Sequence, residues 1–444
     1  MKYILSFAAS EFVNFRQVEF HSLCELFGYN AESSLGQSRQ QHWSQPYVCV
    51  ELENDEAAIQ LSQRSLLIKS VYSLWCSAPS MEELLTEISL LPKELTERYL
   101  SASQSYKVII SSANKKMSQE DKLKLINKVI AAHREITASV NLRDPDHQLN
   151  ILLDYKPRNW VKGTSEHNEE LRRVLYGRLL TTSGRKTLMN SYKLKDRVYL
   201  GNTSMDVRLA GIMANAGLCK HGSIVWDPFV GAGSLLLAAS IWGALGGGSD
   251  IDYALLHGIG MSPKAGQGKR GDDERLFKNY VQYGLQSRYL DVMVADTATL
   301  YRLLRVPDGD VGLFDAIITD PPYGFRESIR RVAERPIERE PSLVTAERLS
   351  EITGVDLSSL SVRLLHPNGR LVFWIAIMRD QFTGPQMLPR HKRLKLLAAC
   401  EQTFNKHHSR IMVVMRKLTL GEDDEPEEID NDLYFPAERG LCCK

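Results

Sequence analysis

The stretch that decides the fold is "SIVWDPFVGAGSLLLAASIWGALGGGSDID", residues 223–252. It predicts a short apolar strand at 223–227, a glycine-containing loop, an apolar helix at 234–244 and a second strand ending in acids. Strand, loop, helix and strand in this order form the repeating unit of a parallel sheet covered by helices.

The chain beyond this stretch continues the alternation. Apolar, β-branched runs predict further strands at 290–296, 314–320, 370–377, 394–402 and 410–418. We therefore expect residues 199–420 to form one α/β domain with a doubly wound, mostly parallel sheet.

The chain before residue 199 has a different pattern. Residues 1–155 mix short strands with helices and predict an α+β region; one helix begins after Ser118, with Asp121 completing a capping box. Residues 156–198 are interpreted as a helical connector, with a helix at 167–180. The acidic run at 421–432 predicts a disordered tail, 421–444.

Composition excludes several classes of protein. The 444 residues carry a net charge of +1, and no run of 18 apolar residues predicts a transmembrane helix. The seven cysteines are scattered without a CxxC pair, which predicts reduced thiols in a cytoplasmic or nuclear protein and argues against a zinc knuckle. The eleven histidines show no metal-ligand spacing. Basic clusters at 264–275, 326–331 and 390–395 fit either a solvated surface or contact with RNA.

Acids stand where successive predicted strands end: Asp227, Asp250 with Asp252, Asp296 and Asp320. Ligands of such sheets bind beyond the carboxyl ends of the strands. One acid there is usually a helix cap, but an unpaired buried acid is costly, so four strand ends with acids indicate a binding site. Ribose hydroxyls and an adenine amino group are suitable donors to these carboxylates.

The loop "DPFVGAGS" selects among nucleotide ligands. It is not a phosphate-binding P-loop, because no Gly-Lys-Ser/Thr follows, and it lacks the third glycine of the dinucleotide fingerprint. Gly231 and Gly233 allow the backbone to approach a ligand closely, and we expect Pro228 of the same loop to contact it. A ligand with adenine, free ribose hydroxyls, a positive centre and no phosphate fits: S-adenosylmethionine. NAD is the alternative.

The second loop, "TDPPYG" at 319–324, predicts the chemistry. A base amino group is a poor nucleophile because its lone pair is delocalised. Asp320 and the carbonyl of Pro321 could accept its two hydrogens and hold the nitrogen in line with a methyl donor. Pro321 and Pro322 fix the loop, and Tyr323 could stack on the base. A stiff turn ending a strand is the structural alternative.

Taken together, these segments resemble the catalytic subunits of eukaryotic tRNA guanosine-10 N2-methyltransferases. The resemblance lies in the order of "GNTSMDVRLAGIMANAG", "DPFVGAGSLL", "DIDY", "YGLQSRYLDVMVAD" and "FDAIITDPPYGFRE" along the chain. "RSLLIKSVYSLW", "KKMSQEDKLKLI" and "LRDPDHQLNILLDY" are similar to the THUMP-containing region of that family.

The resemblance implies a Rossmann-like class I methyltransferase domain behind an N-terminal THUMP module that grips the tRNA acceptor end. It implies N2-methylation of guanosine 10 and a heterodimer with a small zinc-binding activator subunit, and it leaves small nuclear RNA open as a second substrate. In the usual strand order of this fold, 290–296 is an edge strand, to which another chain could add. Thr203 and Ser204 either contact the cofactor or cap the following helix.

Two other functions remain open at this point. One is methylation of a different amine, adenine N6 in nucleic acid or a protein glutamine. The other is RNA binding without catalysis on an inactive methyltransferase fold, which predicts loss of the strand-end acids. Arg326 and Glu327, beside the second loop, are candidates for contact with RNA phosphate.

Overall fold

The computed structural model describes residues 1–8, 12–34, 43–133, 136–156, 170–264, 266–271, 273–307, 309–323, 356–422 and 433–435. The chain divides into two compact units, one of Met1–Glu11 with Asn30–Arg185 and the other of Phe12–Tyr29 with Lys186–Lys444. No helix of the described residues is long and apolar enough to cross a membrane. The basic cluster at 326–331 lies outside the described residues, as does most of the predicted acidic tail; within that tail, Tyr434–Phe435 form a short strand paired with the strand at Leu394–Thr403.

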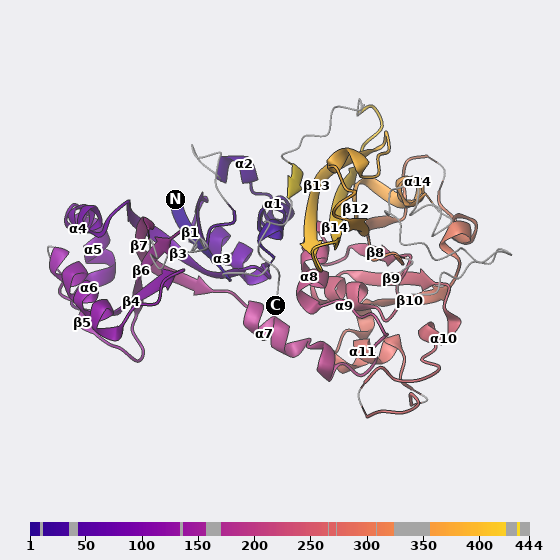
Figure 1. Ribbon diagram of the computed structural model, residues 1–444, viewed down its shortest axis with the longest axis horizontal. Helices are drawn as coiled ribbons and strands as arrows, with labels where there is room; N and C mark the ends of the chain where they lie inside the picture. Colours follow the sequence, from indigo (N-terminus) through magenta and orange to yellow (C-terminus); the bar gives the residue numbers. More distant parts are fainter. Residues whose placement is uncertain are drawn as a thin grey trace. The chain divides into compact units, whose positions relative to one another are not determined.

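The N-terminal unit has an α+β fold with a seven-stranded sheet in the order β2-β1-β3-β7-β6-β4-β5. Helices α4, α5 and α6 lie together against its β3, β4, β6 and β7 part (Figure 1). Its elements are β1 (Lys2–Phe7), α2 (Ala31–Ser34), β2 (Tyr47–Glu51), α3 (Asp55–Arg64), β3 (Ile68–Ala78), α4 (Met81–Ser89), α5 (Lys93–Leu100), β4 (Ser105–Ala113), α6 (Gln119–Ala132), β5 (Ser139–Val140), β6 (His147–Tyr155) and β7 (Leu171–Thr182).

Local sequence signals account for most of this unit, with one failure. The capping box is confirmed: Ser118 accepts from the backbone of Asp121 at 3.1 Å and donates to its carboxylate at 2.7 Å. The helix predicted at 167–180 is wrong, because β7 occupies Leu171–Thr182. Its apolar residues also fit helical spacing, but antiparallel pairing with β3 and β6 decides the structure.

The C-terminal unit contains an eight-stranded sheet in the order β10-β9-β8-β11-β12-β14-β13-β15. Its elements are η1 (Val13–Phe15), α1 (Arg16–Phe27), α7 (Arg185–Ser191), η2 (Leu194–Asp196), α8 (Val207–Ala216), β8 (Ile224–Asp227), α9 (Ser234–Ile241), β9 (Leu245–Asp250), α10 (Tyr253–Leu256), α11 (Leu276–Gln282), η3 (Gln286–Arg288), β10 (Tyr289–Val294), η4 (Thr297–Thr299), α12 (Leu300–Leu303), β11 (Phe314–Thr319), α14 (Leu357–Leu364), β12 (Leu365–Met378), η5 (Pro385–Met387), β13 (Leu394–Thr403), β14 (His408–Lys417) and β15 (Tyr434–Phe435).

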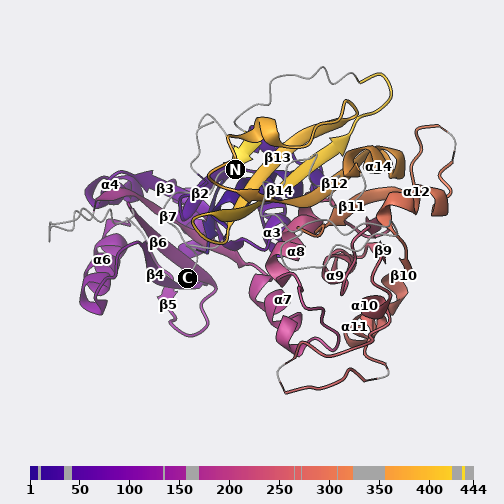
Figure 2. The same ribbon diagram turned by 45° about the vertical axis from the view of Figure 1, so that its right-hand side comes forward.

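The mostly parallel sheet is confirmed for the run from β10 to β12, in which every neighbouring pair is parallel. Strand β14 is antiparallel to both β12 and β13, and these three are the long neighbouring strands in orange and yellow in Figure 2. A hairpin joins β13 to β14, which requires opposite directions. Strand β10 is the edge, as expected for 290–296.

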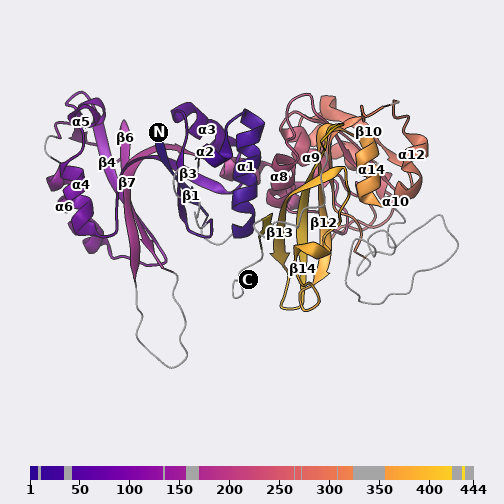
Figure 3. The ribbon, with the colours of Figure 1, turned by 90° about the horizontal axis from the view of Figure 1, so that it is seen from above.

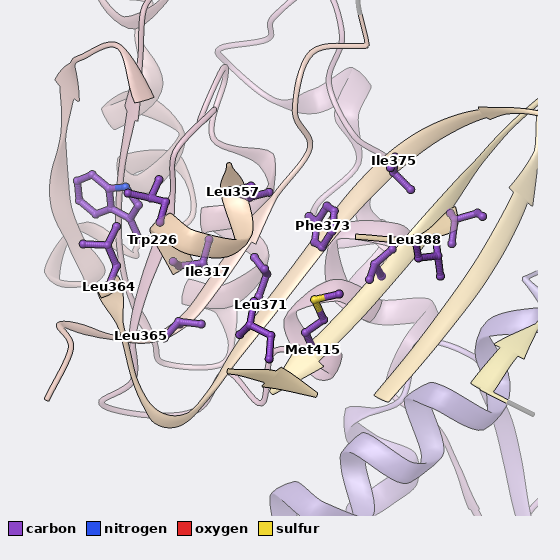
Figure 4. Close-up of a cluster of buried hydrophobic side chains, with 14 of the residues drawn as sticks. Trp226, Ile317, Leu357, Leu364, Leu365, Leu371, Phe373, Ile375, Leu388 and Met415 are labelled. Carbon is purple, nitrogen blue, oxygen red and sulfur yellow. The ribbon is translucent and has the colours of Figure 1, made fainter. Parts of the chain in front are cut away.

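Helices cover both faces of this sheet. On one face, Leu357 and Leu364 of α14 join a buried cluster with Ile317, Leu371 and Phe373 of β11 and β12 (Figure 4). Alternation along a strand turns the next residues to the opposite face.

On that opposite face, Trp374 donates a hydrogen bond to the sulfur of Met213 in α8 at 2.9 Å, and the ring of Phe15 lies 5.9 Å from its ring. Helix α1 lies beside α8 (Figure 3), with Glu19 accepting from Asn215 at 2.9 Å. A segment from the start of the chain therefore belongs to the C-terminal sheet domain.

Candidate active site

The acids predicted at strand ends meet at one edge of the C-terminal sheet. Asp227 and Asp250 are the last residues of β8 and β9, Asp320 follows β11 directly, and Asp296 lies two residues beyond β10. These four strands are parallel neighbours, so their carboxyl ends lie side by side. The fold therefore concentrates negative charge at the edge where such sheets bind ligands.

Asp227 is the most buried of these acids, at 2% exposure. Its Oδ1 accepts hydrogen bonds from the hydroxyl of Thr319 at 2.6 Å and the backbone N–H of Phe229 at 3.0 Å. The pKa of the Asp227 carboxyl is raised to about 7, chiefly by burial. The two hydrogen bonds lower it, and the charges of Asp250 and Asp320 add smaller upward contributions. A bound positive group would favour its ionised form.

The glycine loop is tied to the same edge. Gly231 has φ +50°, donates its N–H to Asp250 at 2.9 Å, and would place a side chain in open space. Gly233 has φ +77°, and a Cβ there would approach Leu276 to 2.6 Å. The carbonyl of Pro228 accepts from the hydroxyl of Thr297 at 2.9 Å. Glycine is therefore required at 233 for packing, whereas at 231 it leaves room beside the acids.

Three of the acids also have local structural roles. Asp250 accepts from the backbone N–H of Asp252 at 2.9 Å, Asp252 caps α10 through Leu255 at 3.0 Å, and Asp296 caps η4 through Ala298 at 2.9 Å. A carboxylate has about four acceptor positions, so a cap leaves capacity for a ligand. The acids thus serve the turns and can still face a bound molecule.

Thr203 and Ser204 do not cap the following helix, because Asp206 caps α8 through the N–H of Arg208 at 2.8 Å. Ser204 instead accepts from the N–H of Gly201 at 3.1 Å. A Cβ at Gly201 would lie 3.2 Å from the Cβ of Ala232, so this segment lies directly against the glycine loop. The capping interpretation is wrong, and the position favours the cofactor interpretation.

The "DPPY" loop follows β11, with Pro321 buried and Pro322 half-buried. The hydroxyl of Tyr323 donates a short hydrogen bond to Oδ1 of Asp320, and its ring packs against the cluster of Figure 4. Burial and the neighbouring Asp320 raise the pKa of Tyr323 well above its usual value, so the hydroxyl keeps its proton. The residues after Tyr323, including Gly324, Arg326 and Glu327, lie outside the described residues.

Arg410 is a site residue that the sequence analysis missed. Its Nη1 donates to Oδ2 of Asp320 at 3.1 Å and to the hydroxyl of Tyr323 at 3.0 Å. A signal was available, because an arginine opens the otherwise apolar run at 410–415. No group of three His, Cys, Asp or Glu side chains that could hold a metal ion occurs in the described part of the chain.

Residues 1–185 match the family described as the Tmrp11 THUMP N-terminal domain. The human tRNA (guanine(10)-N(2))-methyltransferase TRMT11 is 35% identical over 442 residues, covering 96% of this chain and 91% of its own. The Xenopus laevis and Dictyostelium discoideum TRMT11 proteins are 36% and 30% identical, covering 95% and 94% of this chain and 86% and 82% of theirs. The chain belongs to the tRNA (guanine(10)-N(2))-methyltransferase family.

This membership confirms the family that the motifs resemble, and with it an α/β methyltransferase fold behind a THUMP-containing region. Among solved structures, TrmN from Thermus thermophilus matches with a TM-score of 0.43 and 17% identity, covering 94% of this chain and all of that chain. For this member of the family, the edge with the strand-end acids and the "DPPY" loop is the candidate active site.

Proposed function

We propose that this chain transfers a methyl group from S-adenosylmethionine to N2 of guanine 10 in tRNA, and that Asp320 holds the amino group that is methylated. One observation carries the assignment of the site. The "DPPY" loop and the glycine loop follow adjacent parallel strands, β11 and β8, in a chain that spans 91% of the human relative. The reaction follows from membership of the family.

The residues of this edge fit S-adenosylmethionine. The loop 227–234 contains no Lys or Arg to neutralise a phosphate, and Gly231 leaves open space. Carboxylates suit ribose hydroxyls and amino groups. When bound, S-adenosylmethionine supplies a methyl group on a positively charged sulfur. We assign its binding to the residues that the sequence predicts: Thr203, Ser204, Asp227, Pro228, Gly231, Gly233, Asp250, Asp252 and Asp296.

The "DPPY" residues act on the base. Oδ1 of Asp320 accepts a hydrogen from the amino nitrogen, and the carbonyl of Pro321 accepts the other, which fixes the nitrogen and concentrates its lone pair. Pro321 and Pro322 keep both acceptors in place because their φ angles are fixed. Tyr323 supplies a ring on which a base that has left its helix can stack. The proton released after methylation passes to solvent.

The N-terminal unit is proposed to bind the acceptor end of the tRNA, as the resemblance implies for a THUMP module. Lys116, Lys124 and Lys128 are exposed on or next to α6, and such side chains neutralise phosphates. We place the enzyme in the cytoplasm, which agrees with the finding that none of the five cysteines in the described part of the chain forms a disulfide.

A small zinc-binding activator subunit is proposed to add to the edge strand β10. This strand pairs with β9 on one side, and Leu290 and Val294 are 47% and 44% exposed. An exposed apolar edge strand is a template for strand addition by another chain. The subunit would cover apolar area that otherwise promotes aggregation.

The test is tritiated methyl transfer to an unmodified tRNA transcript by the chain co-expressed with the activator, followed by nucleoside mass spectrometry. Asp320→Ala is expected to lower the rate of N2-methylguanosine formation by about two or more orders of magnitude, while the affinity for S-adenosylmethionine changes little. Asp315→Ala is the matched control, since Asp315 lies at the amino end of the same strand. A methylated adenosine, or label on protein alone, would refute the guanine assignment.

A further inference from the structure

Arg410 occupies a built position next to the proposed catalytic carboxylate. It lies near the start of β14 and is only 9% exposed. One nitrogen, Nη1, contacts both Oδ2 of Asp320 and the hydroxyl of Tyr323. Because Tyr323 in turn donates to Oδ1 of Asp320, the three side chains form a closed hydrogen-bonded group.

The guanidinium is held from two further directions. Its Nε donates to the side chain of Gln402 in β13 at 2.8 Å. Its Cζ lies 4.0 Å from the ring centroid of Trp374 in β12, a cation–π distance. Three neighbouring strands therefore fix the orientation of Arg410, and a partner held this firmly can fix the orientation of Asp320.

The two carboxylate oxygens of Asp320 have different partners. Oδ2 contacts an arginine that is anchored in the sheet, whereas Oδ1 contacts the hydroxyl of Tyr323, which belongs to the same short loop. Both bonds are charge-assisted, because the acceptor is a carboxylate, but only the bond to Arg410 also joins two opposite full charges, and only Arg410 is anchored in other strands. An incoming donor can therefore replace Tyr323 at Oδ1 more readily than Arg410 at Oδ2.

We propose that Arg410 is a positioning residue for methyl transfer: it anchors Oδ2 of Asp320 so that Oδ1 faces the amino group of the substrate base, and the Tyr323 hydroxyl occupies Oδ1 until that base arrives. This inference rests on the proposed function of Asp320. No covalent role is assigned to Arg410, which acts on the base only through the carboxylate.

A structural role for Arg410 gives different results. A buried arginine that only joins β11 to β14 would, on removal, lower thermal stability and cofactor affinity together with activity. A positioning role lowers kcat selectively, and it has no further effect once Asp320 is absent. Non-additivity of the two substitutions is therefore the diagnostic observation.

The experiment compares Arg410→Met, which keeps a long side chain against Trp374, and Arg410→Lys, in the co-expressed full-length complex. Arg416→Met is the matched control, since Arg416 lies on the same strand and pairs with Glu422 on the surface. Steady-state methyl transfer, S-adenosylmethionine titration and thermal unfolding are measured for each variant.

We expect Arg410→Met to lower kcat by about 100-fold, with the Kd for S-adenosylmethionine within about twofold of wild type. Arg410→Lys recovers part of that loss, and Arg416→Met remains near wild type. In an Asp320→Ala background, Arg410→Met lowers the residual rate no further. If Arg410→Met fails to fold, the kcat of Arg410→Lys is measured with and without Asp320→Ala. A loss of kcat that occurs only when Asp320 is present then supports the positioning role, and no loss contradicts it.

Unchanged kcat in Arg410→Met, or multiplicative losses in the double variant together with weakened cofactor binding, would overturn the inference. The proposed function is tested separately by the identity of the wild-type product. If that product is a methylated adenosine, the guanine assignment fails. The same variants then still test the role of Arg410, through their rates of forming methylated adenosine.

Discussion

The buried carboxyl of Asp227 leads to a quantitative prediction about pH and stability. The pKa of this carboxyl is about 7 in the folded protein, against 3.8 for an aspartate side chain exposed to water, as in the unfolded state. Between these two values the folded state binds more protons than the unfolded state, so the free energy of unfolding falls as pH rises. The stability that the protonated Asp227 carboxyl contributes to the folded state is fully present below pH 3.8 and is lost as the pH rises through 7.

The magnitude follows from the two pKa values. One pKa unit corresponds to about 1.4 kcal/mol, and integration from pH 5 to pH 8 gives a loss of about 2.5 kcal/mol from this group. Asp227→Asn is neutral throughout, and its amide oxygen can still accept from Thr319 and Phe229. We therefore expect the variant to gain about 2.5 kcal/mol relative to wild type when pH is raised from 5 to 8.

The assay is urea unfolding of wild type and Asp227→Asn at pH 5, 6, 7 and 8, monitored by tryptophan fluorescence. Trp226, next to Asp227, and Trp374 lie in the sheet of the same unit. The difference between the two proteins removes the contributions of all other titrating groups. A difference that stays constant from pH 5 to pH 8 would refute the reasoning, because it would mean that Asp227 keeps one protonation state over this range.

Three further predictions concern the surroundings of the site. Tyr323→Phe removes the hydroxyl that competes for the catalytic carboxylate, so the KM for tRNA is expected to fall by up to about fivefold in steady-state kinetics; a 100-fold loss of kcat would contradict this. Gly233→Ala forces a Cβ to within 2.6 Å of Leu276 at a positive φ and is expected to lower the free energy of unfolding by about 1–3 kcal/mol in urea titration. Leu290→Lys on the edge strand is expected to abolish copurification of the activator, whereas Leu303→Lys, at a leucine outside that strand that is even more exposed, is expected to leave it intact.

The sheet domain was predictable because its signals are local. The strand, loop and helix at 223–244 have distinct apolar patterns, and parallel strands bring their carboxyl ends to one edge whatever the loops do between them. The common position of the acids at this edge could therefore be predicted from the sequence alone. The hydrogen bonds by which these acids cap turns could not be predicted, because an aspartate after a strand can cap a turn, face a ligand or do both.

The failures involve partners that are distant in sequence. The run from Leu171 to Thr182 has spacing that fits a helix, and only pairing with β3, about 100 residues earlier, makes it a strand. Helix α1 stands early in the chain but packs on α8, through contacts such as Glu19 to Asn215, 196 positions apart. Neither the strand pairing nor the helix packing can be predicted from the local spacing of apolar residues.

Arg410 belongs with these distant partners, since 90 positions separate it from Asp320. Yet the cost of burying Asp320 already calls for a partner of this kind. A carboxylate at a partly buried strand end is costly unless a cation or several donors accompany it, and near Asp320 the flanking loop offers two prolines, which have no N–H. A compensating charge from another strand meets this requirement, and an arginine at the start of the apolar run 410–415 is a candidate that sequence alone could have proposed. The cost of burying an acid therefore predicts both the site and the kind of side chain that must complete it.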